Sequence, residues 1–342
     1  SAREHLAGRR ERGLCVAESY LSPGEQFIQV LWTEMFDTGS AASIVYAPLL
    51  PRDSDMAETS VKVNLEGGIA VITGAASGIG EALARHAASE LNMQVVLADI
   101  DGPGVARVAA ELDSLGTRAL AVQTDVSDPA ALDRLAQQTL DHFGTPRLLV
   151  NNAGIETLGW SWEISAEQWD KILDVNIHGV VHGVRAFLPA MLEAGQPCIV
   201  ANLSSLAGVC IAPLQTSYIM SKHAVLAFSE CLQMELQMKK APVQISAVMP
   251  GPVKTRIFSA IDETTDPHVA QHLADMVALL DQNGMEAEAA ASVIFAQLAQ
   301  GKFWVSTHPE MVEAMAAVRA QHLSTLDTPA MDPDNAFFNE AD

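Results

Sequence analysis

The stretch that decides the fold is Ile69-Ala-Val-Ile-Thr73-Gly74-Ala-Ala-Ser-Gly78-Ile-Gly80. Its first part is a continuous apolar run, which is typical of a parallel strand covered on both faces. Glycines follow at once, and they let the backbone turn tightly and approach a phosphate. A helix that begins directly afterwards offers unpaired N–H groups and the positive end of its dipole to that phosphate. The stretch therefore predicts the first strand and helix of a βαβ unit that binds a dinucleotide.

The alternation of strand and helix continues outward from this stretch. Apolar runs predict strands at Ile69–Thr73, Val95–Ala98, Ala119–Gln123, Leu148–Asn151, Cys198–Leu203, Val243–Val248 and Phe303–Val305. Amphipathic segments predict helices at Ile79–Leu91, Pro103–Leu115, Pro129–Phe143, Ala166–Glu193, Thr216–Met238 and Ala287–Ala299. We expect an α/β fold: a Rossmann-like, doubly wound, seven-stranded parallel sheet with helices on both faces, in a single domain. Residues 256–284 interrupt the rhythm and are long enough for one or two extra helices over the site.

The two ends of the chain lack this pattern. Residues 1–55 show no sustained period and no motif, and Met56 opens a run that looks like a natural start. We expect a disordered extension there, with a regulatory or oligomer-contacting arm as the alternative. The domain itself is expected over residues 56–324. From Thr325 the chain holds five acidic residues and no basic one, which predicts a solvated, flexible acidic tail.

Composition excludes several classes of function. Hydrophobic residues make up 49% and charged residues 18%, so the chain can bury a sizeable core. The formal net charge of −22 repels phosphate backbones and anionic lipid, so we expect neither nucleic-acid nor membrane binding. No segment resembles a transmembrane helix of ~20 apolar residues, and no secretory signal is evident. The four cysteines show no paired spacing, which favours reduced thiols in a cytoplasmic protein.

The second predicted strand ends in Asp99, 25 residues after Gly74. A carboxylate there can accept hydrogen bonds from both hydroxyls of an adenosine ribose, and it repels a 2′-phosphate. Neither the glycine-rich turn nor Ile100 supplies an arginine or lysine to receive such a phosphate. The sequence therefore favours NAD over NADP. Asp101 is the alternative ribose ligand, although it more naturally caps the next helix.

The predicted proton chemistry depends on Tyr218 and Lys222. They are four residues apart and so share one face of the helix that begins near Thr216. An ammonium near a phenol stabilises the phenolate, which predicts a tyrosine pKa lowered from about 10 toward neutrality. Such a tyrosine donates a proton to a carbonyl oxygen or accepts one from an alcohol. It is the only tyrosine after Tyr46, so the predicted domain offers no competing phenol.

Taken together and in order, the motifs resemble those of the short-chain dehydrogenase/reductase family in its single-domain form. The resemblance spans about Leu65 to Thr307. It rests on Thr73-Gly74-x-x-x-Gly78-x-Gly80, Asn151-Asn152-Ala153-Gly154, Asn176, Ser205, Tyr218-x-x-x-Lys222 and Pro250-Gly251-Pro252-Val253-Lys254-Thr255. It implies catalytic roles for Tyr218, Lys222, Ser205 and Asn176. The cofactor-binding residues that we expect are Gly74, Ser77, Gly78, Ile79, Gly80, Asp99, Asp125, Val126, Asn152, Ala153, Gly154, Tyr218, Lys222, Pro250, Val253 and Thr255.

The resemblance also implies individual roles. Ser205, thirteen residues before Tyr218, would orient the substrate oxygen, with Ser204 as the competing serine. Asn176 would hold a water that relays protons to Lys222, unless its side chain bonds to local backbone instead. Asp125 and Val126 would lie under the adenine, with helix capping as the alternative for Asp125. The loop Asn152–Gly154 would support the central sheet and the adenosine pocket. The turn Pro250–Thr255 would contact the nicotinamide carboxamide.

Three functions stay open from the sequence. The first is hydride transfer between NAD(H) and a secondary alcohol or ketone, with Tyr218 as general acid/base and without a metal. The others are an NADP(H)-dependent carbonyl reductase and a non-catalytic, dinucleotide-binding scaffold or redox sensor. The residues Trp160, Trp162, Phe258, Met276, Leu279 and Leu280 suggest an apolar substrate or, equally, plain core packing.

Two weaker patterns concern surfaces rather than chemistry. His178 and His182 have metal-ligand spacing, but no third ligand is evident nearby, so we expect packing histidines. The helices at Ala166–Glu193 and Thr216–Met238 carry more apolar surface than one sheet face needs. In similar proteins these helices pair across a two-fold axis, so a homodimer or homotetramer is expected, which light scattering can check.

Overall fold

The computed structural model describes residues 61–259, 261, 264–326 and 328–330, and the backbone of three strands nearer the N-terminus. The chain divides into two units, Ser1–Thr59 and Ser60–Asp342. In the first unit, β1 (Leu14–Leu21), β2 (Glu25–Trp32) and β3 (Val45–Tyr46) form an antiparallel sheet in that order. The sequence did not predict these strands. The rest of residues 1–60 lies outside the described residues, so the disordered extension stays a prediction.

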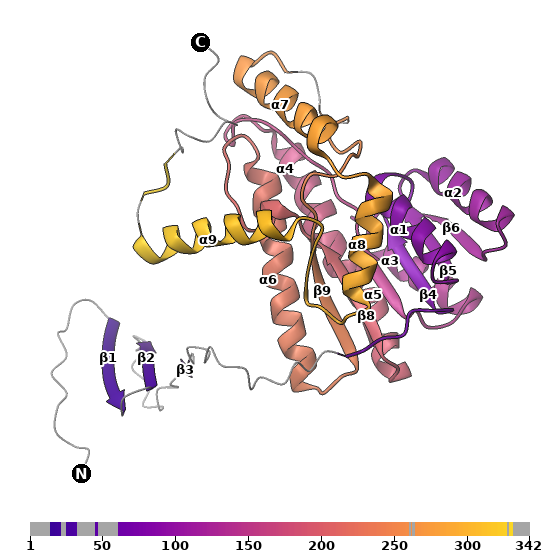
Figure 1. Cartoon of the computed structure of the whole chain (residues 1–342), viewed down its shortest axis with the longest axis horizontal. Helices are drawn as coiled ribbons and strands as arrows, with labels where there is room; N and C mark the ends of the chain where they lie inside the picture. The colour runs from indigo at the N-terminus through magenta and orange to yellow at the C-terminus, as the bar shows by residue number, and fades with distance from the viewer. Residues whose placement is uncertain are drawn as a thin grey trace. The chain divides into compact units, whose positions relative to one another are not determined.

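The second unit is built on a seven-stranded parallel sheet, in the order β10-β9-β8-β7-β4-β5-β6 (Figure 1). Its strands are β4 (Ile69–Thr73), β5 (Gln94–Asp99), β6 (Ala119–Gln123), β7 (Leu148–Asn151), β8 (Cys198–Leu203), β9 (Val243–Met249) and β10 (Trp304–Ser306). The predicted sheet is therefore confirmed, and each strand end lies within one residue of its predicted place.

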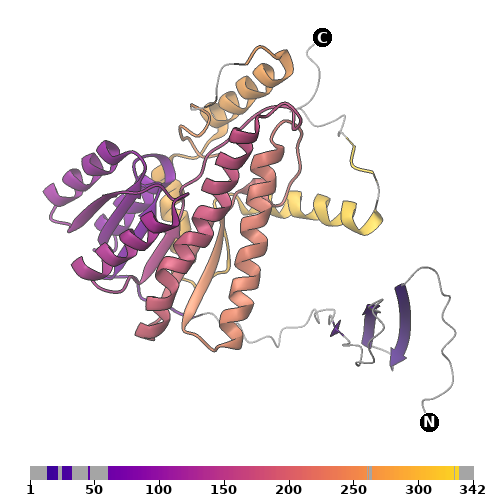
Figure 2. The same cartoon turned by 180° about the vertical axis from the view of Figure 1, so that it is seen from behind.

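Helices cover both faces of this sheet. The α-helices described in this unit are α1 (Gly78–Ser89), α2 (Gly102–Ser114), α3 (Pro129–His142), α4 (Ala166–Leu173), α5 (Gly179–Ala194), α6 (Thr216–Met238), α7 (Pro267–Asn283), α8 (Ala287–Leu298) and α9 (Pro309–Thr325). One face packs against α1, α2 and α8, and the other against α3, α5 and α6. Figure 2 shows α5 and α6 side by side across the second face.

The first strand shows why both faces need a helical cover. Ala70 and Ile72 belong to the hydrophobic cluster on one side of the sheet, and Val71 belongs to the cluster on the other. Successive side chains of a strand point to opposite faces, so a continuous apolar run buries itself only between two layers. The apolar character of β4 thus requires the three-layer architecture that the structure has.

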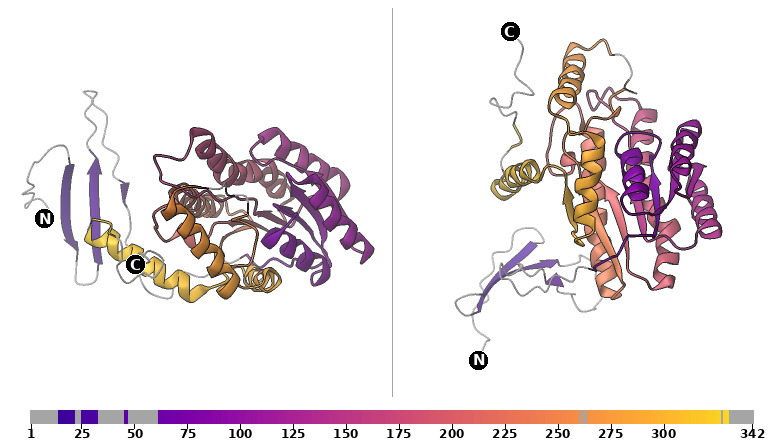
Figure 3. Two further views of the ribbon diagram at one scale, coloured as in Figure 1. Left: turned by 90° about the horizontal axis from the view of Figure 1, so that it is seen from above. Right: turned by 45° about the vertical axis from the view of Figure 1, so that its right-hand side comes forward.

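The strand order places a topological switch point between β4 and β7. From β4 the chain builds outward through β5 to β6, and then α3 carries it back across the sheet to β7. Connections leave β4 and β7 toward opposite faces, which opens a crevice at their carboxyl ends. Figures 1 and 3 show α7 beyond this end of the sheet, where the sequence predicts an extra helix.

Two helical features differ from the sequence prediction. The single helix expected at Ala166–Glu193 consists of α4, a π-helical turn at Asp174–His178 and α5. The helix α9 was not predicted at all. None of its residues is buried, and it extends from the body of the unit (Figure 3). Its apolar residues do not gather on one face, so it lacks the periodicity by which helices are recognised.

A buried chain of polar side chains fixes α6 to the centre of the sheet. Asn151 in β7 donates through Nδ2 to Oδ1 of Asn202 in β8, at 2.8 Å. Asn202 donates to Oγ of Ser229 in α6 at 3.1 Å, and Ser229 donates to the carbonyl of Val225 at 2.7 Å. Such networks favour one arrangement of the elements that they join, although the Asn151 Oδ1 atom has no hydrogen-bond partner among the described residues. The register of α6 against the sheet is set in this way.

Among the helices that the structure describes, none combines the length and the apolar character needed to cross a lipid bilayer.

Candidate active site

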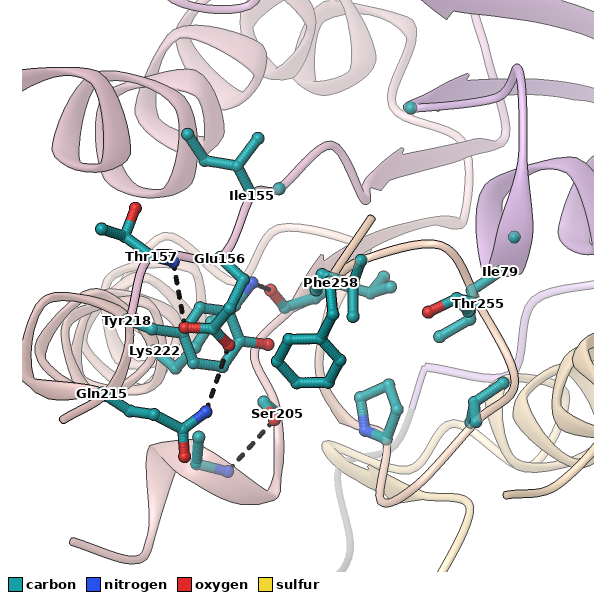
Figure 4. Close-up of a pocket in the computed structure, with 18 of the residues that line it drawn as sticks. Ile79, Ile155, Glu156, Thr157, Ser205, Gln215, Tyr218, Lys222, Thr255 and Phe258 are labelled. Carbon is teal, nitrogen blue, oxygen red and sulfur yellow. Dashed lines mark hydrogen bonds between the residues drawn. The ribbon is translucent and has the colours of Figure 1, made fainter. Parts of the chain in front are cut away.

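A cavity of about 730 Å³ lies at the carboxyl ends of the strands (Figure 4). Nearly all predicted site residues line it: Gly74, Ser77, Gly78, Ile79, Asp99, Asp125, Val126, Asn152, Ala153, Gly154, Ser205, Tyr218, Lys222, Pro250, Val253 and Thr255. Of the predicted set, Gly80 and Asn176 are buried behind its wall. The sequence motifs, far apart along the chain, are thus brought together around one space.

The side chain of Asn152 holds the glycine-rich turn in place. The Asn152 Nδ2 group donates to the carbonyls of Thr73 at 2.8 Å and Gly74 at 3.2 Å. Gly74 has φ +67°, in the left-handed region that favours glycine. A Cβ on Gly80 would lie 2.0 Å from the Gly74 carbonyl oxygen. The turn is therefore packed backbone against backbone, and this leaves its outer side free for a phosphate group.

The N-terminus of α1 opens into the cavity at this turn. Ser77 is the N-cap residue, and its side chain makes no capping hydrogen bond. Across the cavity, Thr255 approaches the turn: a Cβ on Gly78 would lie 3.2 Å from its Cγ2. The first N–H groups of a helix need partners, and an anion is a suitable one. The turn and helix thus fit the pyrophosphate of a dinucleotide.

At the end of the cavity where the sequence predicts the adenosine, two backbone donors fix the Asp99 carboxylate. The N–H groups of Ala76 and Asp101 both donate to it at 3.0 Å. The Asp101 side chain accepts from Gly104 N–H and caps α2, as the sequence predicts. Asp125 lines the cavity, and it also accepts hydrogen bonds from the N–H and hydroxyl of Ser127. The N-cap residue of α3 is Asp128, so the helix-capping alternative for Asp125 is wrong, and its place under the adenine stays a prediction.

One cation near this end was not found from the sequence. Arg107 of α2 donates to the carbonyl of Ala76 at 3.1 Å. The same guanidinium pairs with Glu81 at 2.8 Å and Glu111 at 3.2 Å, so its charge is already balanced. Residues 76 and 107 do not lie at a spacing typical of any motif, so only the folded structure shows this contact.

The predicted catalytic pair lies at the other end, on one face of α6. Tyr218 is 8% exposed and Lys222 is 4% exposed. The Lys222 ammonium lies 5.4 Å from the centre of the Tyr218 ring and donates to the carbonyl of Leu203 at 3.0 Å (Figure 4). Burial lowers the pKa of Lys222 to about 8, because removal of water disfavours the charged form.

The expected lowering of the tyrosine pKa is wrong for the protein as it stands in this structure. Burial raises the pKa of Tyr218 well above its usual value, and a nearby carboxylate, Glu156, raises it further. A hydrogen bond with Ser205 acts in the opposite direction. The cost of placing a phenolate in a buried site thus exceeds the help that its surroundings give. At neutral pH, Tyr218 is a protonated phenol.

The two adjacent serines have different contacts. The Ser204 hydroxyl is buried and donates to the backbone carbonyl of Lys222 at 2.8 Å. Ser205 faces the cavity, accepts from the N–H of Ala207 at 3.1 Å and interacts with the Tyr218 hydroxyl. This arrangement supports Ser205 as the serine that meets a substrate oxygen.

Asn176 lies in the π-helical turn and is completely buried. Its side-chain amide accepts from the N–H of Ile155 and donates to the carbonyl of Ile155, both at 2.9 Å. It also donates to the hydroxyl of Ser221, at 3.0 Å. The side chain therefore clamps the loop after β7 to α6 through contacts distant in sequence, which differ from the local-backbone alternative. Its predicted water relay stays a prediction.

A residue that sequence reasoning missed is Glu156. It lies on the wall of the cavity, is 8% exposed, and accepts hydrogen bonds from Thr157 and Gln215 (Figure 4). Glutamate is mostly exposed in proteins, and nothing in the local sequence marks this one as buried.

Apolar side chains line a further part of the cavity wall. Phe258, Met276, Leu279 and Leu280 line it, as do Met311 and Met315 of α9. The predicted Trp160 and Trp162 are not among its lining residues. Instead, their rings stack at 5.3 Å, and the Trp160 indole donates to Asp266, the N-cap residue of α7. Trp160 thus ties the loop after β7 to the helix over the site.

No group of three potential metal ligands occurs in the part of the chain that the structure describes. The His178 ring pairs with Asp174 at 2.7 Å, and the His182 ring contacts the carbonyl of Val126 at 3.2 Å. Cys198, Cys210 and Cys231 are free thiols, whereas the side chain of Cys15 lies outside the described residues.

Comparison with known proteins agrees with this geometry. Residues 68–266 match the family model described as short chain dehydrogenase. The protein belongs to this family of NAD(P)-dependent oxidoreductases.

Three relatives illustrate the range of the family. SadH of Mycobacterium tuberculosis is 35% identical over 233 residues, which cover 65% of this chain and 84% of SadH. The 1-deoxy-11-beta-hydroxypentalenate dehydrogenase of Streptomyces avermitilis is 36% identical, over 56% of this chain and 71% of that enzyme. A short-chain dehydrogenase/reductase from Burkholderia phymatum, solved with NAD, has a TM-score of 0.75 and 32% identity, and covers 79% of this chain and 98% of its own.

The packing at the glycine-rich turn gives a direct prediction. Gly80→Ala places a methyl group against the Gly74 carbonyl and must displace the turn. We expect dinucleotide affinity to fall by at least about tenfold, or about 1.4 kcal/mol, as measured by NADH fluorescence titration. The control is Gly116→Ala, where no atom lies within 4 Å of the added Cβ but φ +88° strains an alanine; it should cost stability far from the turn and leave dinucleotide affinity unchanged. Wild-type affinity in Gly80→Ala would contradict the proposed position of the pyrophosphate.

Proposed function

We propose that the protein catalyses reversible hydride transfer between NAD(H) and a secondary alcohol or ketone. The observation that carries the proposal is the burial of Tyr218 and Lys222 on the wall of the same cavity as the glycine-rich turn. The nicotinamide supplies the hydride chemistry, and the protein supplies binding, orientation and proton transfer.

When a carbonyl is reduced to an alcohol, Ser205, Tyr218 and Lys222 have different roles. Ser205 donates a hydrogen bond to the substrate carbonyl and holds its oxygen next to the Tyr218 hydroxyl. As the carbonyl carbon receives a hydride, Tyr218 gives its proton to the oxygen, and an alcohol forms. The Lys222 ammonium, below its pKa of about 8, offsets the negative charge left on the phenol oxygen. A protonated Tyr218 at neutral pH supports a role as the proton donor.

The cofactor we propose is NAD rather than NADP. The Asp99 carboxylate is fixed at the adenosine end, where it would repel a 2′-phosphate. The charge of Arg107, which contacts the turn through the carbonyl of Ala76, is already balanced by Glu81 and Glu111. The NAD-bound relative from Burkholderia phymatum is consistent with this choice.

Thermal unfolding in the presence of each nucleotide tests the cofactor. Since ligand binding to the folded state raises its stability in proportion to the logarithm of affinity, NADH should raise Tm more than NADPH at equal concentration. The opposite order would favour the NADP(H)-dependent carbonyl reductase.

The substrate we propose carries a bulky apolar group. Phe258, Met276, Leu279 and Met311 supply apolar wall beyond the predicted catalytic pair. The Streptomyces avermitilis relative is named for a dehydrogenase reaction on a hydroxylated molecule, which supports a hydroxyl as the reacting group. Activity confined to small polar alcohols would contradict this part of the proposal.

We further propose a cytoplasmic homodimer or homotetramer, for which the exposed Met220, Met234 and Met238 of α6 provide apolar contact surface.

The variant Tyr218→Phe separates an enzyme from a dinucleotide-binding scaffold. It removes the proton donor but keeps the ring, so we expect a loss of at least about 10³-fold in kcat/KM with little change in NADH affinity. The measurement is NADH absorbance with a panel of ketones and alcohols, alongside NADH fluorescence titration. Turnover unchanged by the substitution, or no turnover in wild type with any member of the panel, would favour the scaffold.

A further inference from the structure

Glu156 is a buried carboxyl group on the catalytic side of the cavity with no role in the hydride transfer proposed above. It follows β7 in the loop that forms part of the cavity wall. Among the described lining residues, the other carboxyl groups are Asp99 and Asp125, both at the adenosine end. A carboxyl group buried beside the reacting groups affects any step in which charge develops there.

Its position is fixed from two directions. The N–H of Thr157 donates to Glu156 Oε1 at 3.1 Å, and the side-chain amide of Gln215 donates to Oε2 at 3.3 Å. Gln215 is the N-cap residue of α6, three residues before Tyr218. The neighbour Ile155 is held by Asn176 through both its N–H and its carbonyl. The carboxyl group is therefore clamped between the loop after β7 and the first turn of α6.

Its protonation is poised near neutrality. Burial raises the pKa of Glu156 to about 8, while the hydrogen bonds from Thr157 and Gln215 and the charge of Lys222 favour ionisation. In return, the negative charge of ionised Glu156 raises the pKa of both Tyr218 and Lys222. The three groups therefore form one coupled set.

Other titratable groups also face this space. They are Lys171 of α4, Cys210 after β8, Arg256 after β9 and His272 of α7. The charge of Cys210 raises the pKa of Tyr218, whereas Glu156 responds to Lys222 and to its two hydrogen-bond donors. Among the described residues, Glu156 is thus the carboxyl group coupled to both members of the predicted catalytic pair.

We propose that Glu156 is a positioning residue whose protonation state sets the pH at which Tyr218 exchanges its proton with the substrate oxygen. The inference rests on the proposed function. With Glu156 protonated, the phenolate forms beside the Lys222 ammonium without an opposing charge. With Glu156 ionised, a second negative charge opposes the phenolate, so alcohol oxidation requires a higher pH.

The first test is the pH profile of alcohol oxidation in Glu156→Gln. Glutamine has the same shape but no charge, so the pKa of Tyr218 and of Lys222 should fall. We expect the kcat/KM profile to move to lower pH by about one unit. The matched control is Glu163→Gln, which removes an exposed carboxylate from the same loop and should leave the profile unchanged. Coincident profiles for wild type and Glu156→Gln, or a shift to higher pH, would overturn the proposal.

A second test needs no turnover and so separates this inference from the proposed function. The chain has three tyrosines. In a Tyr20→Phe, Tyr46→Phe background, tyrosinate absorbance reports on Tyr218 alone. With NAD added, its rise should begin at lower pH in Glu156→Gln than in the background protein, over the range where circular dichroism shows both folded. A rise at the same pH would overturn the inference even if the enzyme is active, and the expected shift would support it even if no substrate turns over.

Thermal unfolding of Glu156→Gln shows whether the variant folds, and its comparison with the wild type tests the raised pKa of Glu156. The folded-state pKa of Glu156, about 8, lies above its ordinary value of 4.5. Its contribution to stability is therefore complete below about pH 4.5 and is lost as pH rises to about 8. Relative to the variant, the wild type should lose Tm across this window. A constant difference would show that Glu156 is ionised throughout and would overturn the inference.

Discussion

The arrangement of the site depends on the burial of one ammonium group, that of Lys222. Placing an unpaired charge in the interior costs several kcal/mol, and the carbonyl of Leu203 provides its direct hydrogen bond. The pKa of about 8 reflects this cost. Lys222 is kept in this buried position because hydrogen bonds hold α6 from several sides. Ser204 bonds to the Lys222 carbonyl, Asn176 bonds to Ser221, and the Asn202–Ser229 contact fixes the helix to β8. Each bond comes from an element that also builds the cavity wall.

The two ends of the cavity differ in what they offer a ligand. At the adenosine end, backbone atoms dominate: the tightly packed turn, the open N-terminus of α1 and the N–H groups that orient Asp99. At the catalytic end, buried side chains dominate, and the pKa values of Glu156 and Lys222 lie at about 8. A dinucleotide spans such a cavity because its phosphates need N–H groups and its nicotinamide needs a shielded space. The switch point between β4 and β7 places both ends in one crevice.

Much of this was available from the sequence. The first and last residues of strands such as Ile69–Thr73 are predicted correctly, because a short apolar run between turns is typical of a buried strand. The glycines after this strand predict a tight backbone turn, and the four-residue spacing of Tyr218 and Lys222 places both side chains on one face of a helix. The π-helical turn around Asn176 was not predicted, since its cause is a set of tertiary hydrogen bonds to Ile155 and Ser221. Helix α9 lacks the apolar periodicity that reveals helices. Glu156 and the direction of the Tyr218 pKa depend on burial, which no local pattern encodes.

The central claim is that a hydride passes directly between substrate and nicotinamide in this cavity while Tyr218 handles the proton. The most direct measurement uses a secondary alcohol with deuterium on its carbinol carbon, incubated with the protein and NAD. Mass spectrometry of the NADH formed should find one deuterium per molecule, and its formation should be lost in Tyr218→Phe. NADH without the label, or labelled NADH formed at the same rate by the variant, would contradict the account.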